Sequence, residues 1–306
     1  MTKTDSSSPP QRELPDSSWE HFALYKTVRE AIGSLPVYFR TETHISGILA
    51  TDLHTLNTVL GATIEEQVVR TLNLIRTTWD PDGRYALYSF ARQPQTFPDV
   101  RLRKVSGGET LIGIELKGWY LLAKEGEPSL RFQATAAACT RHDLIVVVPW
   151  VLGKVISGSP ILFEPFIESA QYAANFRNYH WQHIRRTDQD VRIDSPTDAK
   201  PYPAKADQIL DKPHSDSGGN FGRLARTGMM NTYMEKLGEI LLCGIRIIFW
   251  RDFLKAFQES TTEAQARAAL ERLRQRVRQA TQLPSSKAQA ALAIIAELEN
   301  ILDLPA

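Results

Sequence analysis

Three ionisable side chains, Asp99, Glu115 and Lys117, have the types and spacing that phosphate chemistry requires. Asp99 lies just before a run that alternates apolar and basic residues, and Glu115 and Lys117 lie in a second run that is rich in Ile, Leu, Trp and Tyr. The sequence Ser-Gly-Gly-Glu at residues 106–109 separates the two runs, and its paired glycines supply the positive φ angles that a tight turn needs. The two runs therefore predict a β-hairpin.

The expected hairpin, with arms over residues 100–105 and 110–122, brings these side chains together. Pairing the arms about the turn places Asp99 opposite Glu115 to Lys117, and Glu115 and Lys117 share one face because strand side chains repeat every two residues. Two carboxylates are hard oxygen ligands that suit Mg²⁺. A lysine can orient or deprotonate a metal-bound water, or neutralise charge on a pentavalent phosphate. Charges on an otherwise apolar strand cost free energy unless they bind something, so the cluster predicts a site for Mg²⁺ and phosphate.

The order Pro98-Asp99 and then Glu115-Leu116-Lys117 resembles the motif of the PD-(D/E)xK nuclease superfamily, which includes most type II restriction endonucleases. The resemblance implies a mixed β-sheet flanked by helices and Mg²⁺-dependent hydrolysis of double-stranded DNA. It also implies that Asp99, Glu115 and the backbone carbonyl of Leu116 ligate the metal, and that Lys117 serves the attacking water. The alternative interpretation is a solvated hairpin held by salt bridges.

A helix is predicted over residues 61–79, before the hairpin. Its apolar residues fall on one stripe at helical spacing, and these are Ile64, Val68, Leu72 and Ile75. Glu65 lies beside the stripe. The spacing resembles that of the helix which precedes the catalytic hairpin in many nucleases of the superfamily, where a glutamate joins the metal site. Alternatively, Glu65 is an exposed first-turn glutamate favoured by the helix dipole.

The order of the predicted elements supports the resemblance. A strand over residues 84–91 precedes the hairpin, a helix over 128–140 follows it, and a β-branched run over 143–148 predicts a strand buried on both faces. Gln133, within the second helix, is interpreted as a surface residue, with a position near the site as the alternative. Helix, strand, hairpin, helix and strand is the core order of the superfamily, so the expected fold class is α/β (α+β), with a mixed central sheet and a helical C-terminal part.

A basic and aromatic cluster is predicted to contact DNA. A helix over residues 165–181 ends in this cluster, which includes Arg177, Arg185 and Arg186. Cations mixed with aromatic side chains suit a phosphate backbone and unstacked bases. Alternatively, the aromatic residues belong to the core and the arginines form a solvated face.

A glycine-rich block late in the chain, Gly-Gly-Asn-Phe-Gly-Arg, supplies a second group of donors in Asn220, Arg223 and Arg226. Asparagine and arginine read adenine and guanine through paired hydrogen bonds, so the block suits base contact. It also resembles segments of bacterial restriction endonucleases. The alternative is a helix cap whose arginines pair with Asp211 or Asp216.

Composition adds little to this interpretation. The chain has 306 residues, is 42% hydrophobic and carries a net charge of +1. Cys139 and Cys243 lie in apolar surroundings and are expected to be buried thiols in a reducing compartment. The longest apolar run, residues 144–152, is too short to cross a bilayer, and the N-terminus lacks a signal peptide. We therefore expect a soluble, cytoplasmic, prokaryotic protein that has no membrane partner.

The expected organisation has five parts. They are a disordered N-terminus (1–17), an N-terminal helical region (18–60), the nuclease core (61–186), a DNA-recognition segment and helix (187–258) and a C-terminal helical hairpin (259–306). The helix in the fourth part is expected over residues 231–258. The expected function is that of a hydrolase, a Mg²⁺-dependent, sequence-specific type II endonuclease that acts on DNA as a homodimer. The alternatives are a structure-directed repair or recombination nuclease and a non-catalytic DNA-binding subunit.

Overall fold

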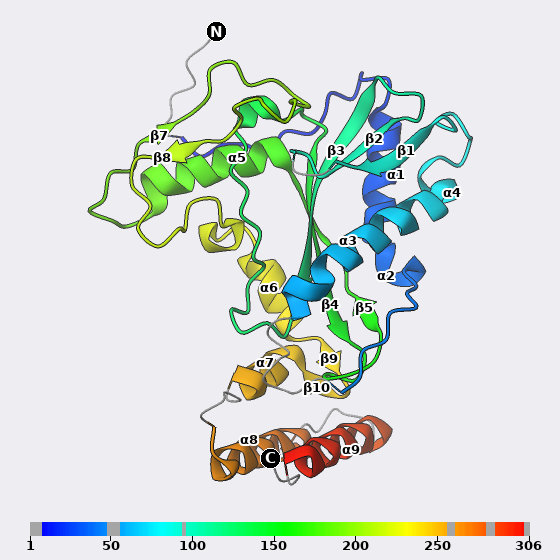
Figure 1. The fold of residues 1–306 in the computed structure, drawn as a ribbon, viewed down its shortest axis with the longest axis vertical. Helices are drawn as coiled ribbons and strands as arrows, with labels where there is room; N and C mark the ends of the chain where they lie inside the picture. The colour runs from blue at the N-terminus through cyan, green and yellow to red at the C-terminus, as the bar shows by residue number, and fades with distance from the viewer. Residues whose placement is uncertain (1–7, 48–55, 94–95, 256–260, 280–284, 303–306) are drawn as a thin grey trace.

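The protein is a mixed α+β structure whose six-stranded sheet is flanked by helices (Figure 1). The computed structural model describes residues 8–47, 56–93, 96–255, 261–279 and 285–302. The strands of the sheet are β1 (Tyr88–Arg92), β2 (Val100–Lys104), β3 (Thr110–Tyr120), β4 (Leu144–Leu152), β5 (Pro160–Leu162) and β6 (Phe166–Ser169). This arrangement confirms the predicted mixed sheet with flanking helices.

The sheet mixes antiparallel and parallel pairs. Strands β1, β2 and β3 form an antiparallel meander, β4 runs parallel to β3, and β5 and β6 both pair antiparallel with β4. Val100 pairs with Ile114 and Leu102 with Ile112, as the predicted hairpin requires. Strand β4 is buried along its whole length, which confirms the prediction made from its β-branched sequence.

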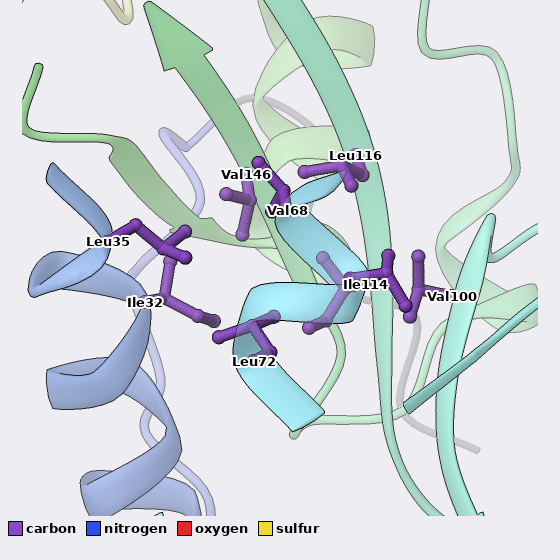
Figure 2. Close-up of a pocket in the computed structure, with 9 residues that line it drawn as sticks. Ile32, Leu35, Val68, Leu72, Val100, Ile114, Leu116 and Val146 are labelled. Carbon is purple, nitrogen blue, oxygen red and sulfur yellow. The ribbon is translucent and has the colours of Figure 1, made fainter. Parts of the chain in front are cut away.

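Helices α1 to α4 cover one face of this sheet. Their bounds are α1 (Phe22–Gly33), α2 (Leu35–Tyr38), α3 (Leu56–Leu74) and α4 (Arg76–Trp79). The predicted stripe of α3 is buried at Ile64, Val68 and Leu72. Figure 2 shows Val68 and Leu72 meeting Ile114 and Leu116 of β3 between α1 and the sheet. Because Ile114 and Leu116 face α3, the intervening Glu115 faces the opposite side of the sheet.

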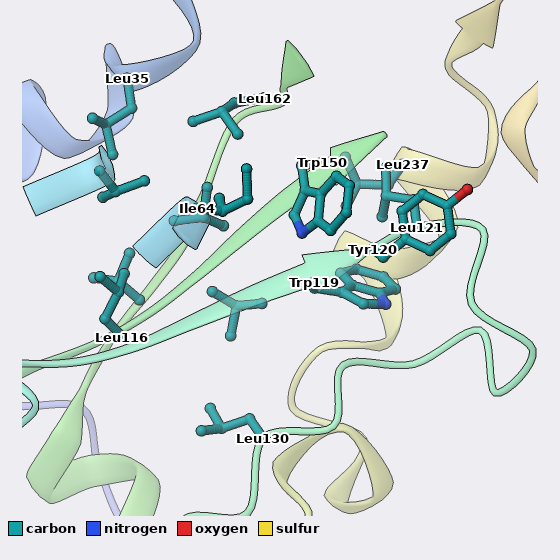
Figure 3. Close-up of a cluster of buried hydrophobic side chains, with 14 of the residues drawn as sticks. Leu35, Ile64, Leu116, Trp119, Tyr120, Leu121, Leu130, Trp150, Leu162 and Leu237 are labelled. Carbon is teal, nitrogen blue, oxygen red and sulfur yellow. The ribbon is translucent and has the colours of Figure 1, made fainter. Parts of the chain in front are cut away.

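The C-terminal half is mainly helical, and its first helix packs against β4 and β6. Its elements are α5 (Ala170–Tyr179), the π-helical turn η3 (His180–Ile184), β7 (Ile193–Asp194), β8 (Lys212–Pro213), the 3₁₀ helix η4 (Leu224–Thr227), α6 (Asn231–Gly238), β9 (Leu241–Leu242), β10 (Ile245–Arg246), α7 (Ile247–Lys255), α8 (Glu263–Gln279) and α9 (Ser285–Leu302). Figure 3 shows Trp119 on the side of β3 where Leu130 lies, and Tyr120 on the other side with Trp150. Helices α8 and α9 pack together as the predicted hairpin. No helix in the described part of the chain is long and apolar enough to span a membrane.

Two predicted helices are replaced by other structures. Residues 128–140 form an extended segment that ends in the 3₁₀ helix η2 (Ala136–Ala138), because residues 131 and 134 form β-bridges with residues 223 and 210. The helix predicted over 231–258 is interrupted by the hairpin of β9 and β10. Cys243 and Gly244 both have positive φ angles in the turn of that hairpin, and such angles cannot continue a helix.

Two other segments, residues 165–169 and residues 8–17, also differ from the prediction. The helix expected from residue 165 begins only at Ala170, because residues 166–169 pair with β4 as β6. Residues 8–17 were expected to be disordered, but part of this segment lies beside α5. The Arg12 Nε donates to Glu168 at 2.8 Å, and its guanidinium lies 4.6 Å from the ring centroid of Tyr172. The rest of that predicted disordered stretch, residues 1–7, lies outside the described residues.

Candidate active site

The site forms beyond the last pair of β2 with β3, where, among the described strands, β3 remains paired only with β4. The last pair of the ladder joins Val100 to Ile114. Beyond it, backbone amides that would face a neighbouring strand donate to carboxylates instead, Leu116 N to Asp99 Oδ2 at 3.1 Å and Gly118 N to Glu65 Oε1 at 3.0 Å. The end of the ladder thus places two acidic side chains, Asp99 just before β2 and Glu65 of α3, along the edge of β3 that β2 leaves open.

Asp99 and Glu115 lie side by side, as the hairpin register predicts. The Oε2 atom of Glu115 is buried and has no hydrogen-bond partner in the described part of the chain. Burial, and then the charge of Asp99, raises the pKa of Glu115 to about 8. Burial also raises the pKa of Asp99 to about 6, against the opposing hydrogen bond from the Leu116 amide. Two adjacent carboxylates with an unsatisfied oxygen fit a divalent cation, which would stabilise both in their charged forms.

Lys117 lies on the same face of β3 as Glu115 and contacts Glu65. Its Nζ is 3.4 Å from Glu65 Oε1, and 31% of its side chain is exposed, so the ammonium can reach a ligand without leaving its partner. The Oε2 atom of Glu65 lies 3.9 Å from Arg92. Arg92 was not singled out from the sequence. In the structure, β1 pairs Arg92 with Val100, the residue after Asp99.

A cavity of about 410 Å³ opens beside the two carboxylates. Asp99 and Glu115 line it together with Phe132, Gln133 and the loop of residues 203–210. Gln133 is therefore at the candidate site, which contradicts its interpretation as an ordinary surface glutamine. The loop that closes the cavity was not expected from the sequence, since it belongs to a segment without periodicity.

Asp143 fixes both the hairpin and this loop. Its side chain is fully buried and accepts hydrogen bonds from the Gly113 and Thr140 amides, both at 2.7 Å, and from the Tyr202 hydroxyl at 2.9 Å. A Cβ at Gly113 would lie 2.6 Å from both Asp143 Oδ1 and Pro98 Cγ, so only glycine permits this approach. Pro98, and with it Asp99, is thereby held against β3.

The predicted DNA-contact residues separate into two groups. Asn220, Arg223 and Arg226 line a second cavity of about 370 Å³, and Arg185 lines it from the opposite segment. Arg186 is exposed but does not line this cavity.

Arg177 is held by partners within the protein. Its side chain is 1% exposed, pairs with buried Asp211 and donates to the Phe132 and Ala134 carbonyls. Its guanidinium is a buried structural group at the wall of the second cavity, so its predicted contact with DNA stays a prediction. The alternative pairing of the block's arginines with Asp211 or Asp216 is wrong, since Asp211 pairs with Arg177 and Asp216 accepts from the backbone amides of residues 220 and 221.

The donor set for a metal consists of two carboxylates. Within the described ranges, no three or more His, Cys, Asp or Glu side chains gather closely enough to hold a metal ion. Glu65 pairs with Lys117 and does not join Asp99 and Glu115 as a third metal ligand. No protein-family model, curated protein or solved structure matches the chain.

Replacing Glu115 with glutamine should stabilise the metal-free protein at alkaline pH. The pKa of Glu115 is about 8 in the fold against an ordinary 4.5, so the folded state binds more protons than the unfolded state between these values. Stability of the wild type therefore falls as pH rises through this window. We expect Glu115→Gln to exceed the wild type by on the order of 2 kcal/mol near pH 8 and to match it near pH 4.5, in denaturant titrations with a chelator present.

Glu66→Gln provides the matched control, because Glu66 is an exposed glutamate on the same helix as Glu65. It should leave the pH dependence unchanged. Added Mg²⁺ should stabilise the wild type and the control but not Glu115→Gln, since only the carboxylate binds the ion. A wild type whose stability does not fall between the two pH values would contradict the burial of an uncompensated carboxyl group at this site.

Proposed function

We propose that the protein is a Mg²⁺-dependent endonuclease that hydrolyses phosphodiester bonds of double-stranded DNA, of the sequence-specific type II class and active as a homodimer. The observation that carries the proposal is the convergence of Asp99, Glu115 and Lys117 where β2 leaves β3, beside a cavity. This is the arrangement that the PD-(D/E)xK resemblance implies. Supporting it is the unpartnered Glu115 oxygen, which a purely structural salt-bridge hairpin would not leave buried.

In this proposal, Asp99 and Glu115 hold Mg²⁺, with the Leu116 carbonyl as a further ligand. When bound, the ion would polarise the scissile phosphate and activate a water molecule for in-line attack. Lys117 donates a hydrogen bond that orients the water and offsets the negative charge that develops on the phosphate. Glu65 restrains the lysine through the contact at 3.4 Å and so limits the rotamers from which Lys117 can act.

The polar groups around the cavity support a phosphate ester as substrate. Gln133 and Arg131 line the same cavity as the two carboxylates and supply neutral and cationic donors. Arg92, beside Glu65, adds a second cation at the edge of β1. A nucleic-acid backbone carries more negative charge than the metal ion alone would neutralise. Cations near the two metal-binding carboxylates therefore suit such a substrate.

Incubation of the purified protein with a large mixed-sequence duplex DNA and Mg²⁺ tests this function. The wild type should give discrete fragments, and Asp99→Asn should give none, because the amide removes a charged ligand while it can still accept the Leu116 hydrogen bond. A chelator should stop the wild-type reaction. The thermal unfolding of Asp99→Asn shows whether the variant is folded.

Each other outcome has a defined meaning. A smear that Asp99→Asn abolishes would replace sequence specificity with non-specific or structure-directed cleavage. Preferential cutting of branched or single-stranded DNA would identify the repair or recombination nuclease. Intact DNA with the folded wild type, over several unrelated DNA sources, would overturn the enzyme and favour a DNA-binding subunit.

A further inference from the structure

The second cavity is joined to the candidate active site through one extended segment, residues 130–134. On one side this segment pairs with the loop that closes the active-site cavity, through a bridge from Ala134 to Leu210. On the other side it pairs with the wall of the second cavity, through a bridge from Arg131 to Arg223. The Phe132 amide also donates to the Gly222 carbonyl at 2.8 Å. The segment that lines the active-site cavity is therefore paired directly with residues that line the second cavity.

Hydrogen-bond donors dominate the walls of the second cavity. Trp181 is 3% exposed, and its Nε1 has no hydrogen-bond partner in the described part of the chain. The Nη1 of Arg223 is also buried and makes no hydrogen bond, and its nearest acceptors are carboxylate oxygens of Glu127 at 3.5 Å and Glu125 at 3.7 Å. Buried donors without acceptors cost free energy, and a ligand rich in acceptor oxygens would relieve that cost.

The charge of the cavity favours an anion. Arg226 Nε donates to Glu127 at 2.6 Å, and Arg223 lies 3.5 Å from the same carboxylate and 3.7 Å from Glu125. Arg185 has no carboxylate partner among the described residues, since it donates to uncharged oxygens of residues 187 and 189. Its guanidinium lies 3.7 Å from the Trp181 ring centroid, which fixes its plane at the cavity wall.

We propose that the second cavity binds a phosphate group of a nucleic acid strand, distinct from the phosphodiester that is hydrolysed at Asp99 and Glu115. Planar guanidinium groups with several fixed donors match phosphate oxygens in geometry and in charge. In the free protein, Glu127 occupies the donors of Arg223 and Arg226, and the phosphate displaces it. The nucleic acid as the source of the phosphate rests on the proposed function, whereas the anion site itself rests on the cavity.

Anisotropy of a short labelled duplex, measured in a chelator so that no cleavage occurs, tests the site. Arg185→Gln and Arg226→Gln should each weaken binding about tenfold and reduce the slope of log affinity against log salt concentration by about 1. Arg272→Gln, which changes an exposed arginine on α8, should change neither quantity. Glu127→Gln should strengthen binding, because it removes the carboxylate that competes with the phosphate.

The opposite response of Glu127→Gln separates a phosphate site from a structural ion-pair cluster. A structural cluster predicts that Glu127→Gln and Arg226→Gln both lower the unfolding temperature and that neither changes the salt slope. Wild-type salt slopes in folded Arg185→Gln and Arg226→Gln would overturn the proposal.

Two further arms identify the source of the phosphate. Titration calorimetry with inorganic phosphate and with deoxyadenosine monophosphate measures binding of the free anions. Binding of either one with the affinity of the duplex, and loss of that binding in Arg185→Gln, would overturn the nucleic-acid source and assign the cavity to a free phosphate compound. Cleavage by the wild type alongside normal salt slopes in the variants would overturn the cavity proposal and leave the nuclease intact.

Discussion

Replacing Lys117 with methionine should lower the single-turnover rate of DNA cleavage by about 10²–10⁴-fold, while the affinity for duplex DNA in a chelator falls by less than about threefold. Methionine keeps much of the length and volume of lysine but removes the ammonium that faces Glu65 and the candidate metal site. The effect should fall on the chemical step because, in the proposed mechanism, Lys117 acts on the attacking water and on charge that develops in the transition state. Rates from rapid-quench experiments and affinities from anisotropy measure the two quantities separately.

Lys236→Met is the matched control for this substitution. The Lys236 side chain is 77% exposed and lies 3.8 Å from Glu164, far along the chain from the site residues, so its loss should leave both quantities unchanged. Glu65→Gln provides a second test, since the amide oxygen can still accept from the Gly118 amide while the ion pair with Lys117 is lost. We expect an intermediate loss of rate, on the order of tenfold, because the ammonium remains but its position is less restrained. Full activity in Lys117→Met would refute the catalytic assignment of Lys117.

The hairpin could be predicted from the sequence because its determinants are local. A glycine pair fixes the turn, alternation fixes the faces, and the turn position then fixes the register that brings Asp99 to Glu115. The helical stripe of α3 is likewise a local pattern, and it placed Glu65 near the hairpin. Asp99, Glu115 and Lys117 come together because they lie within one short stretch of chain.

The segment at residues 128–140 shows where local reasoning fails. Its three consecutive alanines favour a helix, yet its backbone pairs with residues 209–211 and 222–223, which are distant in sequence. Those pairings need close approach at Gly222, where a Cβ would lie 2.8 Å from the Gln133 side chain and 3.0 Å from the Phe132 carbonyl. Tertiary pairing outweighs helix propensity here because satisfying several buried backbone groups is worth more than the propensity difference.

The second cavity was beyond the reach of sequence reasoning for a similar reason. Residue types alone indicated that arginines near residue 180 and near residue 225 could contact DNA. They could not show that Arg185 and Arg223 line one cavity, or that Arg177 is buried between them and the core. Which arginine is buried depends on Asp211, which lies 34 residues later in a segment without any periodic pattern.

Replacing Arg177 with methionine should destabilise the protein by about 3–5 kcal/mol, the largest stability effect that we expect from any single substitution described above. The change would leave the Asp211 carboxylate in a fully buried position without its cation. It would also remove the donor to the Phe132 and Ala134 carbonyls, at 2.8 and 3.1 Å, in the segment that lines the active-site cavity. Denaturant titration followed by fluorescence and circular dichroism measures the loss.

The double variant Arg177→Met with Asp211→Leu separates the charge from the packing. If the unpaired carboxylate causes most of the loss, the double variant should recover a substantial part of the stability, because an apolar pair can replace a buried ion pair of similar volume. Arg186→Met, at an exposed arginine nine residues along the chain, should change stability by less than about 0.5 kcal/mol. Because Arg177 is inaccessible, any loss of DNA affinity in Arg177→Met should follow its loss of folded protein. A variant that remains as stable as the wild type but binds DNA less tightly would return Arg177 to the DNA-contact surface.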